Sequence, residues 1–279
     1  MNSKVEVIHS KIWEEVPEGD NPFAAAASFC SGYDVYGELL GKAGWAEFVF
    51  LLFRRERPQR IQARLFEDLA VVLANPGPRD PAVHAAMSAG VGGSTHASCL
   101  MAALAVGAGQ LGGAREVLVA MQAWQTCGQQ LDAWLGHLVK PSPEERIDVW
   151  LPIEHAPGFD PHGASCATTV RQTLNQLANA SPGPALPWLA AQRVVLETSA
   201  GCPLAMSGVA AAAFIDLGFS PQQGEMLYLL LRLPGAAAHA LEQEDLGFRN
   251  FPFFGNGLEI MDDPARKHAP AHETTEVPA

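Results

Sequence analysis

One stretch of the chain, between Pro81 and Arg115, contains no Asp, Glu or Lys and no Arg before position 115, and it constrains the fold most. It is long enough to cross a bilayer, which takes about 20 apolar residues. However, it also holds His84, His96, several serines and seven glycines between positions 89 and 113. Polar side chains are rare in a membrane span, whereas glycines let helices approach closely. We therefore predict buried helices packed through small residues, and no membrane span.

Helical patterns lie on both sides of this stretch. Apolar residues recur at spacings of four, four and three on one helix face, namely Ile61, Leu65, Leu69 and Val72. The sequence NPGP at 75–78 ends that helix, and Asp80–Pro81 supplies an N-cap and a first-turn proline for the next one. Further helices are predicted at 44–53, 114–139, 168–180, 187–200, 207–219 and 224–243. No section is rich in strands, so the predicted fold class is mainly α.

Changes in composition divide the chain into parts. The segment KPSPEER at 140–146 is a polar, proline-bearing connector, and the residues after it are richer in Pro, Gly and His. The pattern indicates a large helical domain interrupted by a smaller one. The predicted parts are a loose N-terminal arm at 1–20, a large domain at 21–149 and 207–262, a small domain at 150–206, and a disordered, proline-rich tail at 263–279.

The composition of the chain indicates which kinds of partner it binds and in which cellular compartment we expect it. The net charge of −12 argues against nucleic acid, because phosphates would be repelled. Only 17% of the 279 residues are charged, which suggests that a subunit interface covers much of the surface. Polar and charged residues follow Met1, so we expect no signal peptide and a cytoplasmic protein. The five cysteines form no zinc-binding spacing, and we expect free thiols and no metal: Cys30, Cys99, Cys127, Cys166 and Cys202.

Six segments follow one another along the chain: GYDVYGELLGKAGWAEFVFLLFRRERP (32–58), LFEDLAVVLANPGP (65–78), VGAGQLGGAREVL (106–118), APGFD (156–160), SGVAAAAFIDLGF (207–219) and LRLPGAAAHALEQ (231–243). Their content and order resemble the citrate synthase superfamily, and most closely its citryl-CoA lyase branch, which includes the C-terminal module of ATP-citrate lyase. The resemblance covers about residues 25 to 255. No single motif is specific, but six in the same order make the match specific for the fold.

The resemblance implies a helical homodimer in which each subunit has a large and a small domain with the site between them. Members of the family join an acyl-CoA enolate to a keto acid, or run the reverse cleavage. One Asp is the general base, one His stabilises the enolate oxygen, and a second His and several arginines hold carboxylates. The implied partners are a coenzyme A thioester, as substrate and not as a permanently bound cofactor, and a carboxylate.

Two positions of this chain depart from the family pattern. Citrate synthases place a His before the glycine pair, whereas here Leu111 precedes Gly112 and Gly113. This loss alone is not decisive, because members of the lyase branch can lack that His too. Together with Gly109, the pair predicts a turn in which backbone segments approach closely. The family's Asp base falls on Leu204, and leucine cannot accept a proton.

The loop that reads PGFGH in many family members reads PGFDPHG here, at 157–163. With one inserted residue the family's His falls on His162, and Arg171 then takes the place of a downstream carboxylate-binding Arg. The alternative for His162 is a solvent-exposed loop side chain. Asp160 is new to this loop, and it is either a base moved across the site or a cap for the following turn.

Two late arginines complete the candidate site. Arg232 precedes Gly235 by three residues, as in the family's SRxxG pattern, where the Arg binds a substrate carboxylate. In so apolar a helix its charge needs an anionic partner, either a ligand or an acidic side chain. Arg249 resembles a late Arg that reaches across the dimer interface.

These residues leave two functional readings. In the first, the protein carries out acyl-CoA carbon–carbon chemistry with an altered active site, and His162 and Asp160 are the candidate catalytic groups. In the second, it is an inactive homologue that binds a CoA thioester or polycarboxylate, or pairs with an active partner subunit. The loss of the usual groups at 111 and 204 favours the second on chemical grounds. An enzyme lineage more often changes its reaction than loses it, however, and the arginine and loops are retained, so the first is the predicted function and the second its alternative.

Overall fold

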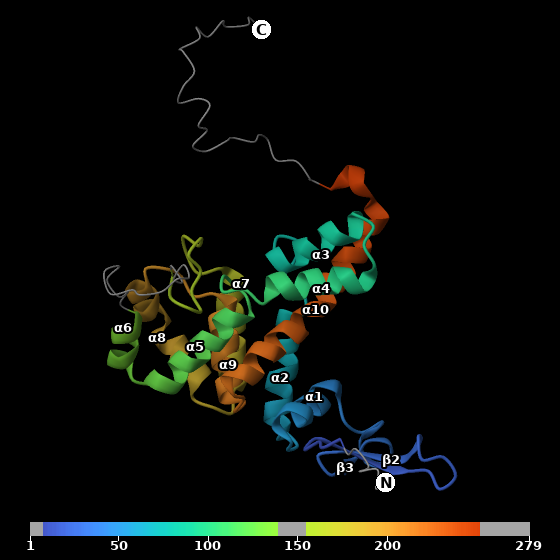
Figure 1. The fold of residues 1–279 in the computed structure, drawn as a ribbon. Coiled ribbons are helices and arrows are strands. Elements are labelled where there is room, and N and C mark those ends of the chain that lie inside the picture. The colour runs from blue at the N-terminus through green and yellow to red at the C-terminus, as the bar shows by residue number, and fades with distance from the viewer. Residues whose placement is uncertain (1–7, 139–154, 252–279) are drawn as a thin grey trace, which may run out of the picture.

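The computed structural model describes residues 8–138 and 155–251, and this part of the protein is mainly α-helical, which confirms the predicted fold class (Figure 1). Its α-helices are α1 (Trp45–Arg54), α2 (Arg60–Leu73), α3 (Pro81–Val91), α4 (His96–Gly107), α5 (Ala114–Cys127), α6 (Leu131–Leu138), α7 (Thr168–Ala180), α8 (Ala185–Ala200), α9 (Met206–Asp216) and α10 (Pro221–Leu246). Two short turns are the π-helix η1 (Val35–Leu39) and the 3-10 helix η3 (Phe248–Asn250).

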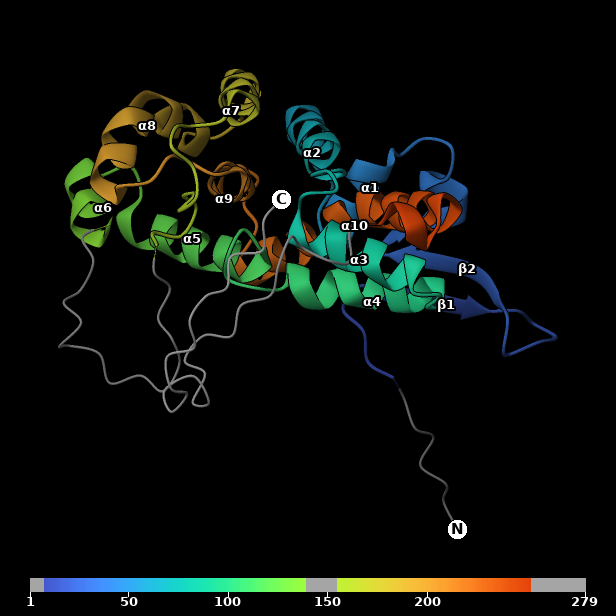
Figure 2. The same cartoon turned by 90° about the horizontal axis from the view of Figure 1, so that it is seen from above.

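The stretch without charges forms the antiparallel pair α3 and α4, which packs on α10 (Figures 1 and 2). As the sequence predicts, Asp80 caps α3 by accepting hydrogen bonds from the backbone N–H groups of Ala82 and Val83, and Pro81 is the first helical residue. Gly90 lies so close to α10 that a Cβ atom there would be 2.7 Å from the carbonyl oxygen of Ala240. Within the described ranges, no helix combines the length and hydropathy needed to cross a membrane.

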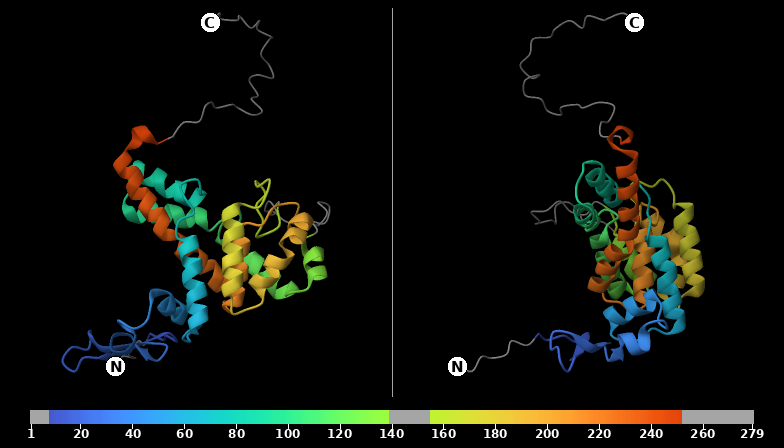
Figure 3. Two further views of the ribbon diagram at one scale, coloured as in Figure 1. Left: turned by 180° about the vertical axis from the view of Figure 1, so that it is seen from behind. Right: turned by 90° about the vertical axis from the view of Figure 1, so that its right-hand side faces the viewer.

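Helix α10 joins two groups of helices. It packs against α2, α3, α4, α5 and α9, and its first half belongs to the main hydrophobic core through Leu227 and Leu231. Its second half, through Ala236 and Ala240, closes a smaller core with α3 and α4. Figures 1 and 3 show α5 to α9 beside the first half of α10 and the pair α3 and α4 along its second half. Figure 2 shows α1 and α2 on the opposite side of α10 from α3 and α4.

The helices of the predicted small domain at 150–206 pack into the main hydrophobic core. Leu174 of α7 and Leu196 of α8 share one continuous buried core with Val117 of α5, Phe214 of α9 and Phe50 of α1. The division into a large domain at 21–149 and 207–262 and a small domain at 150–206 stays a prediction. Parts of the predicted arm, connector and tail, at 1–7, 140–146 and 263–279, lie outside the described residues.

The structure also contains strands that the sequence analysis did not predict. They form an antiparallel sheet in the order β1 (Trp13–Pro17), β2 (Ala25–Cys30) and β3 (Tyr33–Asp34). The predicted loose arm at 1–20 is therefore wrong for β1. Ser31 and Gly32, with φ of 50° and 88°, make the tight turn between β2 and β3. Every residue of β1 is exposed, so the strand has no buried face. Its sequence therefore lacks the apolar–polar alternation by which a half-buried strand is predicted.

Candidate functional site

The glycine pair forms a tight junction between α4 and α5. Gly113 is the N-cap of α5, and a Cβ atom there would lie 2.8 Å from the carbonyl oxygen of Gly107 and closer still to that of Gly109. Gly112 has a φ of 65°, a conformation that glycine adopts readily. Leu111 is half exposed on the outside of the turn. The backbone of this turn folds against itself, as the glycine spacing predicts.

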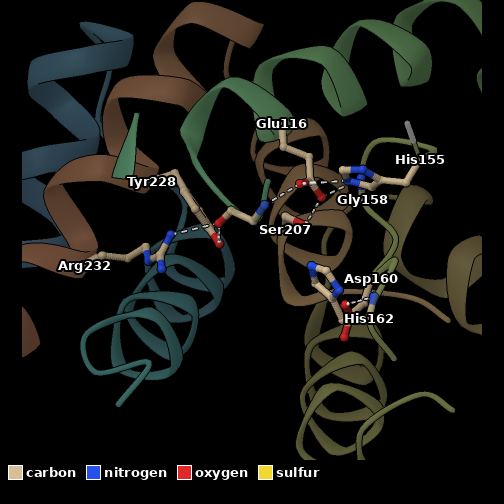
Figure 4. A network of polar contacts seen from close by, with 9 residues as sticks. Glu116, His155, Gly158, Asp160, His162, Ser207, Tyr228 and Arg232 are labelled. Carbon is tan, nitrogen blue, oxygen red and sulfur yellow. Dashed lines mark hydrogen bonds and ion pairs between the residues drawn. The ribbon is translucent and has the colours of Figure 1, made fainter. Parts of the chain in front are cut away.

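A buried carboxylate follows the turn and holds it in place. Glu116, in the first turn of α5, is 1% exposed. Its Oε2 accepts hydrogen bonds from the backbone N–H of Gly112 (2.6 Å) and from Nε2 of His155 (3.3 Å). Its Oε1 accepts from the backbone N–H of Gly158 (2.9 Å) and from Oγ of Ser207 (2.6 Å). One side chain thus joins the glycine turn, the loop that starts at His155, and the first turn of α9 (Figure 4).

The same loop lies against the start of α9 through its backbone. Phe159 and Leu204 form an isolated antiparallel bridge, in which the N–H of Ala205 donates to the carbonyl oxygen of Gly158 (2.9 Å). Gly158 has a φ of 91°, and a Cβ atom on Gly208 would clash with its carbonyl oxygen. Leu204 is 3% exposed, so an apolar side chain fills the position that the family resemblance assigns to the base.

Asp160 lies beside that position. Its N–H donates to the carbonyl oxygen of Pro203 (2.8 Å), and this places Asp160 next to the bridge. Its Oδ1 accepts from the N–H of His162 (2.9 Å), which is the turn cap considered in the sequence analysis. Within the described residues, no group donates a hydrogen bond to its Oδ2. His162 is exposed, and Figure 4 shows both side chains on the same side of the Glu116 network.

Arg171 lines a cavity that includes Gly163, three residues after Asp160. This cavity of about 420 Å³ is lined by Gly163, Cys166, Arg171, Arg193 and Glu197, among others. The Arg171 side chain is exposed and donates to Oγ1 of Thr168 (3.0 Å). Arg193 pairs with Glu197 (2.6 Å), while burial raises the pKa of the Cys166 thiol, and Glu197 raises it further. The protonated thiol favoured there is a poor nucleophile, and Arg171 is the guanidinium most open to a ligand.

Arg232 already has an anionic partner within the chain. Its buried guanidinium forms an ion pair with Asp80, donates to the carbonyl oxygen of Gly112 (3.0 Å), and lies 4.8 Å from the centre of the Tyr228 ring. The sequence leaves two anionic partners open for Arg232, a ligand or an acidic side chain, and in the structure an acidic side chain, Asp80, pairs with it. Burial raises the pKa of Tyr228 to about 12, so its hydroxyl stays protonated and donates to the same carbonyl oxygen.

Close to Arg232, the continuous helix α10 contains a proline, Pro234. Pro234 has no N–H group, so it removes one hydrogen bond from the interior of the helix. The N–H of Gly235 donates instead to the carbonyl oxygen of Ala74, at the end of α2 (2.7 Å). A Cβ atom on Gly235 would lie 2.5 Å from that oxygen, so glycine is required there. The RxxG spacing therefore joins α2 to α10 one turn beyond the buried arginine.

Arg249 is distant from this cluster in the same subunit. It lies in η3, exposed beside the Phe248 ring, at the end of α10 next to α3 and α4. The helix between Arg232 and η3 spans roughly 20 Å. Its predicted role across a subunit interface stays a prediction.

The sequence does not predict three residues of the hydrogen-bond network around Glu116: Glu116 itself, His155 and Ser207. Glu116 carries a weak signal, because a glutamate three residues after a helix N-cap is typical of a capping carboxylate. The other two carry none, since their partner is distant in the sequence. Within the described residues, no group of three or more His, Cys, Asp or Glu side chains is placed to hold a metal ion. A cavity of about 700 Å³ lies between α1, α2 and α10, and none of the predicted site residues lines it.

Comparisons with known proteins identify the fold. No protein-family model and no curated protein sequence matches the chain. A solved structure of citryl-CoA lyase from Hydrogenobacter thermophilus matches with a TM-score of 0.66 and 19% identity, over 98% of both chains. ATP citrate lyase from Methanothrix soehngenii, in complex with citrate and coenzyme A, matches with a TM-score of 0.70 and 20% identity, over 96% of this chain and 44% of that one.

A mutant of ATP citrate lyase from Methanosaeta concilii, in complex with (3S)-citryl-CoA, matches with a TM-score of 0.69 and 18% identity, again over 96% of this chain and 44% of the other. The chain therefore spans less than half of the ATP citrate lyases and nearly all of citryl-CoA lyase. At these identities the likeness concerns the fold. This chain has the mainly α, citrate-synthase-like fold of citryl-CoA lyase and of the matching part of ATP citrate lyase, as the order of its sequence motifs predicts.

Proposed function

We propose that the protein binds a coenzyme A thioester and a carboxylate substrate and makes or breaks the carbon–carbon bond between them, with Asp160 as the general base. In place of the family's Asp at 204, the altered site would thus use the carboxylate of Asp160, which lies next to the backbone bridge between Phe159 and Leu204. His162 would lie beside the reacting atoms, and Arg171 would hold a substrate carboxylate. The ligands of the ATP citrate lyases with this fold, citrate, coenzyme A and (3S)-citryl-CoA, support this choice of substrate class.

The observation that carries the proposal is the position of Asp160. Its backbone is bonded to Pro203, one residue before Leu204, and its Oδ2 has no donor within the described residues. A half-buried carboxylate with one free oxygen is suited to accept a proton. The cavity that contains Arg171 begins at Gly163, where a Cβ atom would lie 2.9 Å from the same Oδ2.

The test is the rate of acyl-CoA condensation or citryl-CoA cleavage in Asp160→Asn. The amide keeps an oxygen for the N–H of His162, so the turn is preserved, but it cannot act as a base. We expect the rate to fall by about 10²–10⁴-fold, with the thermal unfolding midpoint unchanged. Product formation is followed by mass spectrometry, because free cysteines interfere with thiol reagents. A wild-type rate in this variant would remove Asp160 from the mechanism.

The second candidate is an inactive binding protein, or a subunit that pairs with an active partner. The specific observations in its favour are the buried leucine at 204 and the internal partner of Arg232. Ligand-induced thermal stabilisation separates the two candidates, since saturation at a hundred times Kd adds about 2.7 kcal/mol even without turnover. Coenzyme A, acetyl-CoA, oxaloacetate and citrate would be tested alone and in pairs. Arg171→Ala should weaken carboxylate binding, while Arg64→Ala, an exposed arginine on α2, is the matched control.

A homodimer is part of the same proposal, and the exposed face of α4 is its expected contact. This helix has no Asp, Glu, Lys or Arg, and its exposed residues are His96, Ala97, Met101, Ala105 and Val106. Met101 is 60% exposed. Met101→Glu would bury an unpaired charge in the dimer, so we expect the dimer dissociation constant to rise by about 10–100-fold in sedimentation velocity. Val71→Glu, a change on α2 at a residue that is 72% exposed, should leave it unaltered.

A further inference from the structure

We propose that Glu116 is a positioning residue that fixes the Asp160 loop and the glycine turn relative to each other, and so controls binding and turnover at this site. The inference rests on the proposed function for its effect on turnover. Its structural part, the coupling of the two segments, stands on the hydrogen bonds alone and can be measured without a ligand.

The argument begins with the donors around one carboxylate. Among the residues that the structure describes, four groups reach it, and all are donors: two backbone N–H groups, the imidazole Nε2 and a serine hydroxyl. They come from three segments, and Gly158 and Ser207 are 42 and 91 residues away from Glu116 in the sequence. A glutamine has the same shape but replaces one acceptor oxygen with an NH₂ group, which would face donors. The arrangement therefore requires a carboxylate, and not only a polar side chain.

Both halves of the candidate site are bonded to this network. On one side, Gly112 donates its N–H to Glu116 while its carbonyl oxygen accepts from Arg232 and Tyr228. On the other side, Gly158 donates to Glu116 two residues before Asp160. Figure 4 shows the Glu116 network between the Arg232 side and the Asp160 side. A loss of the carboxylate should therefore loosen both halves together.

The predicted role differs from that of an ordinary structural carboxylate, and the chain offers one for comparison. Asp216, at the end of α9, accepts hydrogen bonds from Oγ of Ser181 (2.6 Å) and from the N–H groups of Ala185 (2.7 Å) and Leu186 (2.9 Å). It fixes the start of α8, away from the glycine turn and the Asp160 loop. Asp216→Asn removes a similar number of charged hydrogen bonds and serves as the matched control.

The experiment is hydrogen–deuterium exchange of the ligand-free protein, read by mass spectrometry at 107–113 and 156–163. In Glu116→Gln we expect exchange to rise by about tenfold or more in both segments together, because one backbone N–H then faces the NH₂ group and the other is left with a neutral and weaker acceptor. Asp216→Asn should leave both unchanged and raise exchange at the start of α8. Ser207→Ala, which removes one donor and keeps the carboxylate, should give a smaller rise in the same two segments. Exchange that rises in only one segment, or equally in the Asp216→Asn control, would overturn the coupling.

Ligand binding and turnover form the second readout. If the wild-type protein binds or turns over its ligands, Glu116→Gln should raise Kd or KM by about tenfold and lower kcat, whereas Asp216→Asn should change neither. If Glu116→Gln and Asp216→Asn changed Kd, KM and kcat equally at the same stability, Glu116 would have only a structural role. A wild-type protein that neither binds nor turns over these ligands would contradict the proposed function alone, because the exchange result would still confirm or refute the coupling.

Discussion

Arg232→Ala is expected to lower the free energy of unfolding by about 3–5 kcal/mol, the cost of removing one partner of a buried ion pair. The guanidinium is buried between Asp80 and the Tyr228 ring, and it also donates to Gly112. Its removal leaves the Asp80 carboxylate, itself 16% exposed, without a cation. Urea denaturation followed by circular dichroism measures the change.

The control for this prediction is a second arginine with an acidic partner. Arg64 pairs with Asp68 one turn away on α2, but its side chain is 67% exposed. Arg64→Ala should therefore change stability by less than about 1 kcal/mol. If Arg232→Ala had an equally small effect, the ion pair with Asp80 would be dispensable and the arginine would be free for a ligand carboxylate. The expected loss means that binding to this arginine has to be tested in variants whose stability has been measured.

Much of the fold follows from local rules that act within a few residues. The apolar spacing from Ile61 to Val72 gives α2, and Asp80 with Pro81 gives the start of α3. The charge-free stretch gives α3 and α4, whose glycines touch α10. These signals need no distant partner, and the order of the motifs then identifies the citrate-synthase-like fold.

The errors arise where distant parts of the chain decide the outcome. β1 has no buried face and is held by backbone pairing with β2, so its side-chain pattern carries little information. The domain boundaries at 149 and 207 follow from composition alone, and composition does not say which helices share a core. The main core joins residues of α1, α2 and α10 with those of α5, α7, α8 and α9.

The candidate site was predictable to a similar degree. The glycine turn and the capping role of Asp160 follow from local residue types. Arg232 was predicted to need an anion, but the choice between Asp80 and a ligand depends on a residue 152 positions away. Glu116 is an unremarkable glutamate in a helical pattern, and only the folded chain surrounds it with donors.

Gly208→Ala is expected to lower the free energy of unfolding by about 2–3 kcal/mol, the range of a strongly overpacked site. The new methyl group would lie 2.9 Å from Cδ1 of Leu204 and closer still to the carbonyl oxygen of Gly158. The leucine can rotate away, but the carbonyl oxygen cannot move easily. It accepts from the N–H of Ala205, and the N–H of the same glycine is bonded to Glu116. Urea denaturation gives the loss of stability, and hydrogen exchange at 156–163 reports whether the loop separates from α9.

Gly136→Ala is the matched control for this substitution, and the expected sign is opposite. Gly136 is exposed within α6, and a Cβ atom there would meet no atom within 4 Å. Alanine is favoured over glycine in a helix interior, so this variant should gain about 0.5–1 kcal/mol. Gly208 is also in a helix, so propensity alone would make its substitution stabilising as well. A loss at 208 together with a gain at 136 would therefore assign the effect to contact with the Asp160 loop. If both variants gained stability, the close packing of that loop on α9 would be refuted, and with it the position of Asp160 on which the proposed function depends.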